Sequence, residues 1–333
     1  MLIVGLGLIL LLPAICDANE ADDDDSFEVT EVAGDNPAGR ARQPREQKRK
    51  KQPPKAPTGI HVTYKNADGE EKDLDDDLRQ ACNRADLQEI RKLLDIRKEI
   101  TDHEGADIHP RDKYGNAPLH DAARQGRVEV AQVLLEGGHD TNLENGMADR
   151  PLHMSAASGQ LAMTKLLVEH GAEIDPQTSW GMTPMYWTAN GGSPAHIKVA
   201  RYLISRGADV SVKTTANYTM LHEAAREGHL DMCKLLLDAG IDGDATEPGL
   251  GETALHKAAA AGHADVVELL LSAGLSEDVT NKAGETPIAT AHKAEKDSVV
   301  EVFMDRAARV AKTKSKAKKK KKKKKAKEKH SEL

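Results

Sequence analysis

The chain is poor in cysteine, and disulfide bonds are therefore excluded as the framework of its fold. Only three cysteines occur in 333 residues. Cys16 lies in an apolar N-terminal segment, whereas Cys82 and Cys233 fall in predicted helices about four layers apart, or roughly 35 Å at ~9 Å per layer. A disulfide needs Cα atoms within about 7 Å of each other. We therefore expect Cys82 and Cys233 to be buried thiols.

The chain also lacks a long hydrophobic run. Its most apolar segment, from Leu2 to Cys16, is shorter than the roughly 20 residues that a membrane-spanning helix needs. The segment combines an apolar run, the helix-breaking Pro13 and small residues with an acidic flank, which is typical of a secretory signal peptide. We interpret residues 1–18 as a cleaved signal peptide and predict no membrane span.

Common catalytic motifs are missing. The sequence has no Ser/His/Asp grouping, no phosphate-binding loop and no HExxH zinc motif. It therefore favours a non-catalytic protein without cofactor or metal. An enzyme whose site is built from scattered residues is the alternative.

Acidic residues outnumber basic ones outside the C-terminus. The formal net charge is -7, but residues 312–333 contain thirteen lysines against two glutamates, so this tail carries +11 and everything before it carries -18. An acidic body argues against a nucleic-acid-binding face on the folded part. No nucleic acid partner is expected.

The segment after the predicted signal peptide has few large apolar residues. Residues 19–59 are rich in charged residues and proline, and we predict a disordered linker because such a composition buries too little apolar surface. Its KRKK run at residues 48–51 resembles a nuclear localisation signal, although such runs are common in solvated linkers. Residues 60–77 begin with alternating apolar residues and contain Asp68-Gly69, which predicts a short hairpin.

One stretch of sequence recurs through the middle of the chain. The segment YGNAPLHDAARQGRVEVAQVLLEGG at residues 114–138 returns as MADRPLHMSAASGQLAMTKLLVEHGA at 147–172 and as LGETALHKAAAAGHADVVELLLSAG at 250–274. One position of the repeat is held in turn by His120, His153, Tyr186, His222, His256 and Ala289, at intervals of 33, 33, 36, 34 and 33 residues. Such a period indicates a repeat array.

These repeats resemble the ankyrin repeat family, whose unit of about 33 residues carries a T-P-L-H-x-A signature. Six units cover residues 111–307, and LRQACNRADLQEIRKLL at 78–94 is similar to a degenerate N-terminal unit, so the array spans residues 78–307. The resemblance implies an all-α, ankyrin-type helical solenoid with β-hairpin fingers and disordered flanks. The signature recurs with variations as Thr183-Pro184, Thr253-Ala254-Leu255-His256 and Thr286-Pro287.

The repeated histidines have a structural explanation in this resemblance. Each lies one whole repeat from its counterpart, and the family pattern implies that its ring nitrogens bond local backbone rather than a metal. The third unit is irregular, because Tyr186 replaces the histidine. Three extra residues around Gly192-Ser193-Pro194 predict a longer loop between the two helices of that unit.

Ankyrin-like arrays generally bind proteins, so the resemblance implies a protein partner on the concave surface of a monomer. Both tryptophans of the chain fall in the third unit, and aromatic residues are frequent binding hot spots. The alternative is that Trp180 packs on its own hairpin and Trp187 on the next inner helix. The matching exposed positions are Tyr114, Asn116, Arg124, Met147, Met154, Trp180, Met182, Trp187, Tyr218, Glu223 and Arg226, of which all but Asn116, Met154 and Glu223 are predicted partner-binding residues.

The C-terminus carries a second sequence that resembles a targeting signal. Residues 308–333 are predicted to be a disordered, lysine-rich tail, and its last four residues resemble the KDEL or HDEL retrieval signal of the endoplasmic reticulum, with Ser331 in place of the acidic residue. With the signal-like N-terminus, this predicts a lumenal scaffold or adaptor that also binds a KDEL-type retrieval receptor. The four residues are His330, Ser331, Glu332 and Leu333.

Two further sequence features bear on the cellular compartment in which the protein acts. Asn217-Tyr218-Thr219 is an N-glycosylation sequon, and Asn217 occupies a hairpin-tip position that glycine fills in other units. A cytosolic or nuclear scaffold is the alternative, with the basic runs at residues 48–51 and 318–325 acting as import signals.

Overall fold

The computed structural model describes residues 63–66, 68–104 and 109–331. The predicted signal peptide of residues 1–18 and the linker of residues 19–59 lie outside the described residues, as do Glu332 and Leu333. The described chain begins with an antiparallel hairpin of β1 (Thr63–Lys65) and β2 (Glu71–Asp73), in which Tyr64 faces Lys72. This hairpin lies within the segment of residues 60–77.

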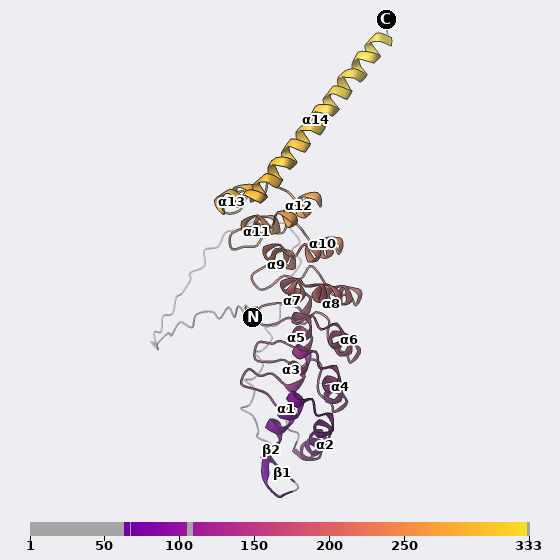
Figure 1. Ribbon diagram of the computed structural model, residues 1–333, viewed down its shortest axis with the longest axis vertical. Coiled ribbons are helices and arrows are strands. Elements are labelled where there is room, and N and C mark those ends of the chain that lie inside the picture. Colours follow the sequence, from indigo (N-terminus) through magenta and orange to yellow (C-terminus); the bar gives the residue numbers. More distant parts are fainter. Residues whose placement is uncertain (1–62, 67, 105–108, 332–333) are drawn as a thin grey trace, which may run out of the picture. The chain divides into compact units, whose positions relative to one another are not determined.

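Helices in the described part of the chain alternate between an inner and an outer row (Figure 1). The inner row contains α1 (Leu74–Arg84), α3 (Pro118–Gln125), α5 (Pro151–Ala157), α7 (Pro184–Gly191), α9 (Met220–Glu227), α11 (Ala254–Ala261) and α13 (Pro287–Lys293). The outer row contains α2 (Leu87–Glu104), α4 (Val128–Glu136), α6 (Leu161–Glu169), α8 (Pro194–Ser205), α10 (Leu230–Asp238), α12 (Ala264–Ser272) and α14 (Asp297–Ser331). Each inner helix contacts its outer partner and the neighbouring inner helices. The predicted helical solenoid is confirmed.

The start of each inner helix follows from the repeated signature. In α11, the Thr253 hydroxyl accepts a hydrogen bond from the backbone N–H of His256 at 3.4 Å. In α3, the corresponding residue is Ala117, which has no side-chain oxygen, and the Nδ1 atom of His120 accepts the backbone N–H of Ala117 at 3.1 Å. Such caps satisfy helix-end groups that would otherwise lack partners, and each is worth about 1 kcal/mol.

A continuous core joins the two rows. Small alanines such as Ala258 and Ala259 are fully buried in the inner helices, and leucines such as Leu270 fill the space beside the outer helices. Because every unit buries its apolar face against the next one, no unit has a complete core alone.

The prediction of a longer loop between the two helices of the third unit is wrong. Its inter-helix loop holds only residues 192 and 193, the same length as in the first unit, so the extra residues do not lengthen the loop. They extend the outer helix instead, since α8 has 12 residues where α6 and α10 have 9. Ser193 has an extended cap conformation and Pro194 occupies the first turn, and proline there starts a helix without losing a hydrogen bond.

The last outer helix also differs from the prediction. Gly274, with a φ of 92°, follows the end of α12, whereas the equivalent residue of α14 is Ala307. Without a residue that favours the left-handed conformation, α14 continues into the lysine-rich tail as far as Ser331. Alanine and lysine are good helix formers. The tail predicted to be disordered over residues 308–333 is thus described as helix up to residue 331.

Candidate functional site

The hairpin fingers between successive units are tied together through their tips. The backbone carbonyl of Tyr114 accepts the N–H of Gly146 at 3.0 Å, and the carbonyl of Trp180 accepts the N–H of Thr215 at 2.9 Å. The equivalent bond joins the Leu250 carbonyl to the next finger at 2.8 Å. Each tip residue is therefore held in position by its neighbouring finger, which fixes the spacing of the tip side chains.

Large apolar side chains gather at these tips. Seven are exposed in the described part of the chain, and four of them occupy the same position in the first, second, third and fifth fingers. We name these four the fingertip row: Tyr114 (60% exposed), Met147 (48%), Trp180 (47%) and Leu250 (60%). Exposed apolar side chains that recur at equivalent positions along one edge are typical of an interaction surface, whereas scattered ones need no explanation.

Three members of this row were among the sequence-predicted residues, and Leu250 was missed. The signal for Leu250 is its register, because it precedes Gly251 as Tyr114 precedes Gly115, and both glycines have a positive φ. In the fourth and sixth fingers the equivalent positions hold alanine.

The other predicted residues lie beside the row with less free surface. Met182, Trp187 and Tyr218 are half-buried, and the indole nitrogen of Trp187 is buried without a hydrogen-bond partner in the described structure. Arg124 and Arg226 are exposed, and both are engaged in ion pairs: the Arg124 Nη2 atom lies 3.1 Å from Asp121, and that of Arg226 lies 2.6 Å from Glu223. Of the two tryptophans, only Trp180 presents a large open surface.

The prediction that Glu223 is exposed is wrong, because its carboxylate is buried beneath this face. Glu223 is 6% exposed, and its oxygens accept hydrogen bonds from the Asn190 side chain at 2.8 Å, the Arg226 guanidinium at 2.6 Å and the Tyr186 hydroxyl at 3.5 Å. Burial, with the Glu223 charge nearby, raises the pKa of the Tyr186 phenol. The tyrosine that replaces the repeated histidine thus ties α7 to α9 through a carboxylate and fixes the place of Arg226.

The repeated histidines are structural, as the resemblance implied. The Nε2 atom of His120 donates to the Asp149 carbonyl at 3.0 Å, and its Nδ1 atom accepts from its own unit. His153 makes the equivalent link from the second unit to the third, where its Nε2 atom donates to the Pro176 carbonyl at 3.1 Å, and burial lowers its pKa to about 4. These rings therefore stay neutral at pH 7, and each links its own unit to the following one. Among the described residues, no group of three or more His, Cys, Asp or Glu could hold a metal ion.

The two described cysteines are buried free thiols, as predicted. Burial raises the pKa of Cys82 and of Cys233 to about 12, so neither is an activated nucleophile. Within the described ranges, none of the helices is both long and apolar enough to cross a membrane.

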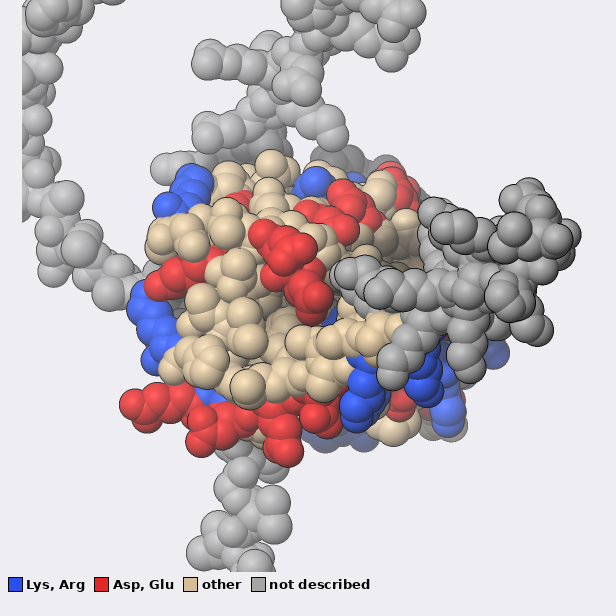
Figure 2. All heavy atoms as spheres, turned by 90° about the horizontal axis from the view of Figure 1, so that it is seen from above, with Lys and Arg blue, Asp and Glu red and all other residues tan. Residues whose placement is uncertain are grey.

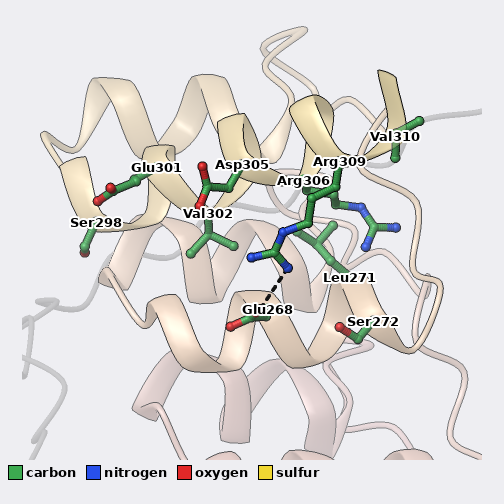
Figure 3. A pocket seen from close by; sticks show the side chains of 10 residues that line it. All are labelled: Glu268, Leu271, Ser272, Ser298, Glu301, Val302, Asp305, Arg306, Arg309 and Val310. Atoms are coloured by element: carbon green, nitrogen blue, oxygen red, sulfur yellow. Dashed lines mark ion pairs between the residues drawn. The ribbon is translucent and has the colours of Figure 1, made fainter. Parts of the chain in front are cut away.

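A groove of about 390 Å³ lies between α12 and α14 (Figure 3). Its lining combines apolar side chains with charged ones that pair across it: the Arg309 Nη1 atom lies 3.8 Å from the Glu268 carboxylate. The neighbouring Arg306 Nε atom lies 3.6 Å from Glu277. The groove therefore marks where α14 is fastened to the array.

The face drawn in Figure 2 carries charged side chains of both signs. In the view of Figure 2, acidic side chains gather along the lower edge and near the centre, and basic ones lie toward the two sides. This face shows no single basic field of the kind that nucleic-acid-binding surfaces present.

Comparisons with known proteins agree with this architecture. A family model described as "Ankyrin repeats (3 copies)" matches residues 152–247 and 221–314, and one described as "Ankyrin repeat" matches residues 114–146. Together they cover more than half of the chain. The chain belongs to the ankyrin repeat family. A comparison with curated proteins gives no match.

Two solved structures are similar to the ankyrin array. The human ASB11 ankyrin repeat domain is 29% identical, with a TM-score of 0.52 over 57% of this chain and 83% of that one. The ankyrin repeat domain of Bcl-3, described as a unique member of the IkappaB protein family, is 20% identical, with a TM-score of 0.57 over 68% of this chain and 97% of that one. The second likeness concerns the fold alone.

Proposed function

We propose that this ankyrin array is a non-catalytic scaffold or adaptor that binds a protein partner over the fingertip row and the adjoining inner-helix face. The row supports the proposal, because four large apolar side chains stand exposed at equivalent tips. Tryptophan and tyrosine are enriched among binding hot spots, and methionine adapts to irregular surfaces. The hydrogen bonds between fingers hold the row in place before binding, which lowers the entropy lost on association.

Site-specific photo-cross-linking tests this proposal. A photoreactive amino acid replaces Leu250 at a fingertip in one sample and Glu169, an exposed residue of the outer helix α6, in a matched sample. We expect the position 250 probe to capture a partner protein from cells in high yield and the position 169 probe to capture little of it. Equal yields at the two positions would contradict the assignment of the interface.

We further propose that the protein acts in the endoplasmic reticulum lumen, delivered by residues 1–18 and retrieved through residues 330–333 by a KDEL-type receptor. Asn217 supports glycosylation there, because it is exposed at a hairpin tip with a φ of 59°. Thr219 of the same sequon is buried as the cap of α9. The enzyme must therefore modify Asn217 before this unit folds, and we expect partial occupancy.

Deletion of residues 331–333 is expected to release the protein into the medium, because the receptor loses its signal while the array keeps its core. The secreted form should begin near residue 17 to 19 and show a glycosidase-sensitive mass shift that Asn217→Gln abolishes. Substitution of exposed Asp238 by asparagine is the control and should leave the protein in the cell. A cytosolic pool with an intact Met1 favours the alternative of a cytosolic or nuclear scaffold.

A further inference from the structure

The last helix of the array carries an exposed apolar side chain where the other units are covered. Met304 of α14 is 65% exposed, more than any other large apolar side chain in the described part of the chain. Its counterpart one repeat earlier, Leu271 of α12, is 2% exposed and lines the groove between α12 and α14 (Figure 3). Met304 therefore occupies a position that a following unit would bury, and the described chain has no unit after α14.

The exposed apolar surface of α14 continues for two turns beyond this residue. We define the end face as Met304 and the three exposed alanines that follow it at helical spacing, Ala307, Ala308 and Ala311. Arg309 turns to the other side of the helix, where it pairs with α12. The terminal unit of a solenoid needs a polar outer face for solubility, so an apolar end face calls for a cover.

Charged side chains flank the end face in a pattern that is complementary to itself. Glu301 and Asp305 lie near its start, and Lys312 lies beyond its end. Because Lys312 follows Glu301 by eleven residues, or about three helical turns, the two lie on the same side of α14. All three charged side chains are exposed, and the ion pairs of the described structure involve none of them. The face is thus acidic at one end and basic at the other.

We propose that the end face is a homodimer interface, in which α14 of a second copy lies antiparallel on α14 of the first. A two-fold axis between residues 307 and 308 sets Met304 of each copy opposite Ala311 of the other. Small side chains at the crossing let two helix axes approach to about 8 Å. The second copy takes the place of the following unit and replaces the monomer that the family resemblance implied.

The antiparallel arrangement also matches the charges. The same axis brings Lys312 of one copy level with residue 303 of the other, between Glu301 and Asp305. The symmetry repeats this contact on the opposite side, so opposite charges meet twice. A surface that complements itself in this way is what a two-fold interface requires. It favours a second copy over an unrelated protein as the cover.

Other arrangements of two copies fit the described surface less well. A parallel pair would place the exposed Lys312 and Lys316 beside their own counterparts, and like charges set against each other oppose association. Head-to-tail stacking would need an apolar surface on α1 and α2. None of the exposed large apolar side chains of the described chain lies on these two helices.

The predicted contact is short. From Glu301 to Lys312 the helix extends about 16 Å, which places the interface at the small end of specific interfaces. We therefore expect a dimer that dissociates on dilution, with a Kd on the order of 10 µM. The end face is separate from the fingertip row, so its test does not depend on the proposed partner. A dimer presents two such rows to a bivalent partner.

Charge reversal tests the proposal in the full chain. One variant carries E301K and D305K, and the other carries K312E; all three positions are exposed. Alone, each variant sets like charges against each other at both symmetric contacts, and its Kd for self-association should rise at least about tenfold. An equal mixture restores opposite charges at both contacts, so heterodimers should form with about the wild-type Kd. Sedimentation velocity with one variant fluorescently labelled measures both.

Substitution of the apolar anchor tests the same contact without reversing the flanking charges. Met304→Glu places a charge where the second helix packs and should keep the chain monomeric up to about 100 µM. The matched control is Leu230→Glu, at an exposed apolar residue of α10, and its Kd for self-association should equal that of the wild type. A wild-type chain that stays monomeric at this concentration, charge variants that fail to associate when mixed, or a dimer that Met304→Glu leaves intact would each overturn the proposal.

Discussion

Replacement of Trp180 by alanine is expected to weaken partner binding about 30-fold while leaving the stability of the array nearly unchanged. Truncation of a tryptophan anchor costs about 2 kcal/mol or more of binding free energy, and 2 kcal/mol corresponds to roughly 30-fold in Kd. Because Trp180 is 47% exposed at a finger tip, the variant loses little core packing. The measurements are the Kd for the partner captured at position 250 and the urea unfolding midpoint.

Two variants serve as controls for Trp180. Leu230→Ala removes another exposed apolar side chain, but from the start of the outer helix α10, so partner affinity should stay unchanged. Trp187→Ala removes a half-buried side chain from α7, and we expect a loss of about 2 kcal/mol in unfolding free energy, roughly half the cost of truncating a fully buried tryptophan. If Trp180→Ala destabilises the array as strongly as Trp187→Ala, Trp180 belongs to the core and the row is not the interface.

The repeated residues allowed the fold to be predicted because each has a local physical role. The cap formed by Thr253, the first-turn position of Pro184 and the buried pair Ala258-Ala259 depend on backbone geometry and on the neighbouring unit. Because the same role recurs at the same position of each repeat, the residue type that fills it recurs as well, and this recurrence is visible in the sequence. The exposure of Trp180 could be predicted for the same reason, since the finger tip recurs with the period.

Features that break the period were harder to predict. The three extra residues of the third unit extend α8 because Pro194 starts a helix, although their number alone was equally compatible with a longer loop. The Glu223 network depends on contacts of α7 with α9 across 33 to 37 residues, which no local pattern reveals. The continuation of α14 depends on one missing glycine, at the position of Ala307.

His139 is a further departure from the repeat. It follows Gly138 at the end of α4, where the equivalent residues of other units are the buried apolar Ala172, Ile241 and Leu275. The His139 side chain is 5% exposed, and neither ring nitrogen has a hydrogen-bond partner in the described structure. A buried polar group without a partner costs about 1–3 kcal/mol.

Substitution of His139 by leucine, the residue of the fifth unit, is therefore expected to stabilise the array by about 1 to 2 kcal/mol at pH 7. The new side chain is apolar, and its size suits a site that Leu275 fills elsewhere in the array. Urea unfolding at pH 7 measures the effect. The control is His292→Leu on α13, where the histidine is exposed, and its unfolding free energy should change little.

The larger effect of His139→Leu is expected in acid. Burial, with repulsion of the protonated ring by His109 and Arg97, lowers the pKa of His139 to about 3. The His109 ring centroid lies 5.0 Å away, and the Arg97 Nη1 atom pairs with Asp75 at 2.6 Å. The unfolded chain has an ordinary histidine pKa of about 6.5, so between pH 6.5 and 3 the unfolded state binds the extra proton. Stability is therefore lost as the pH falls through this window, by about 2 kcal/mol at pH 5 for this residue.

The His139→Leu variant removes that proton from the unfolded state, so the difference between variant and wild type should grow by about 2 kcal/mol from pH 7 to pH 5. Other buried histidines such as His153 remain in both proteins, and their acid sensitivity cancels in the comparison. Urea unfolding of the two proteins across this pH range measures the difference directly. A difference that stays constant from pH 7 to pH 5 would mean that His139 accepts a proton in the folded array as readily as in the unfolded chain, with the ring turned toward solvent.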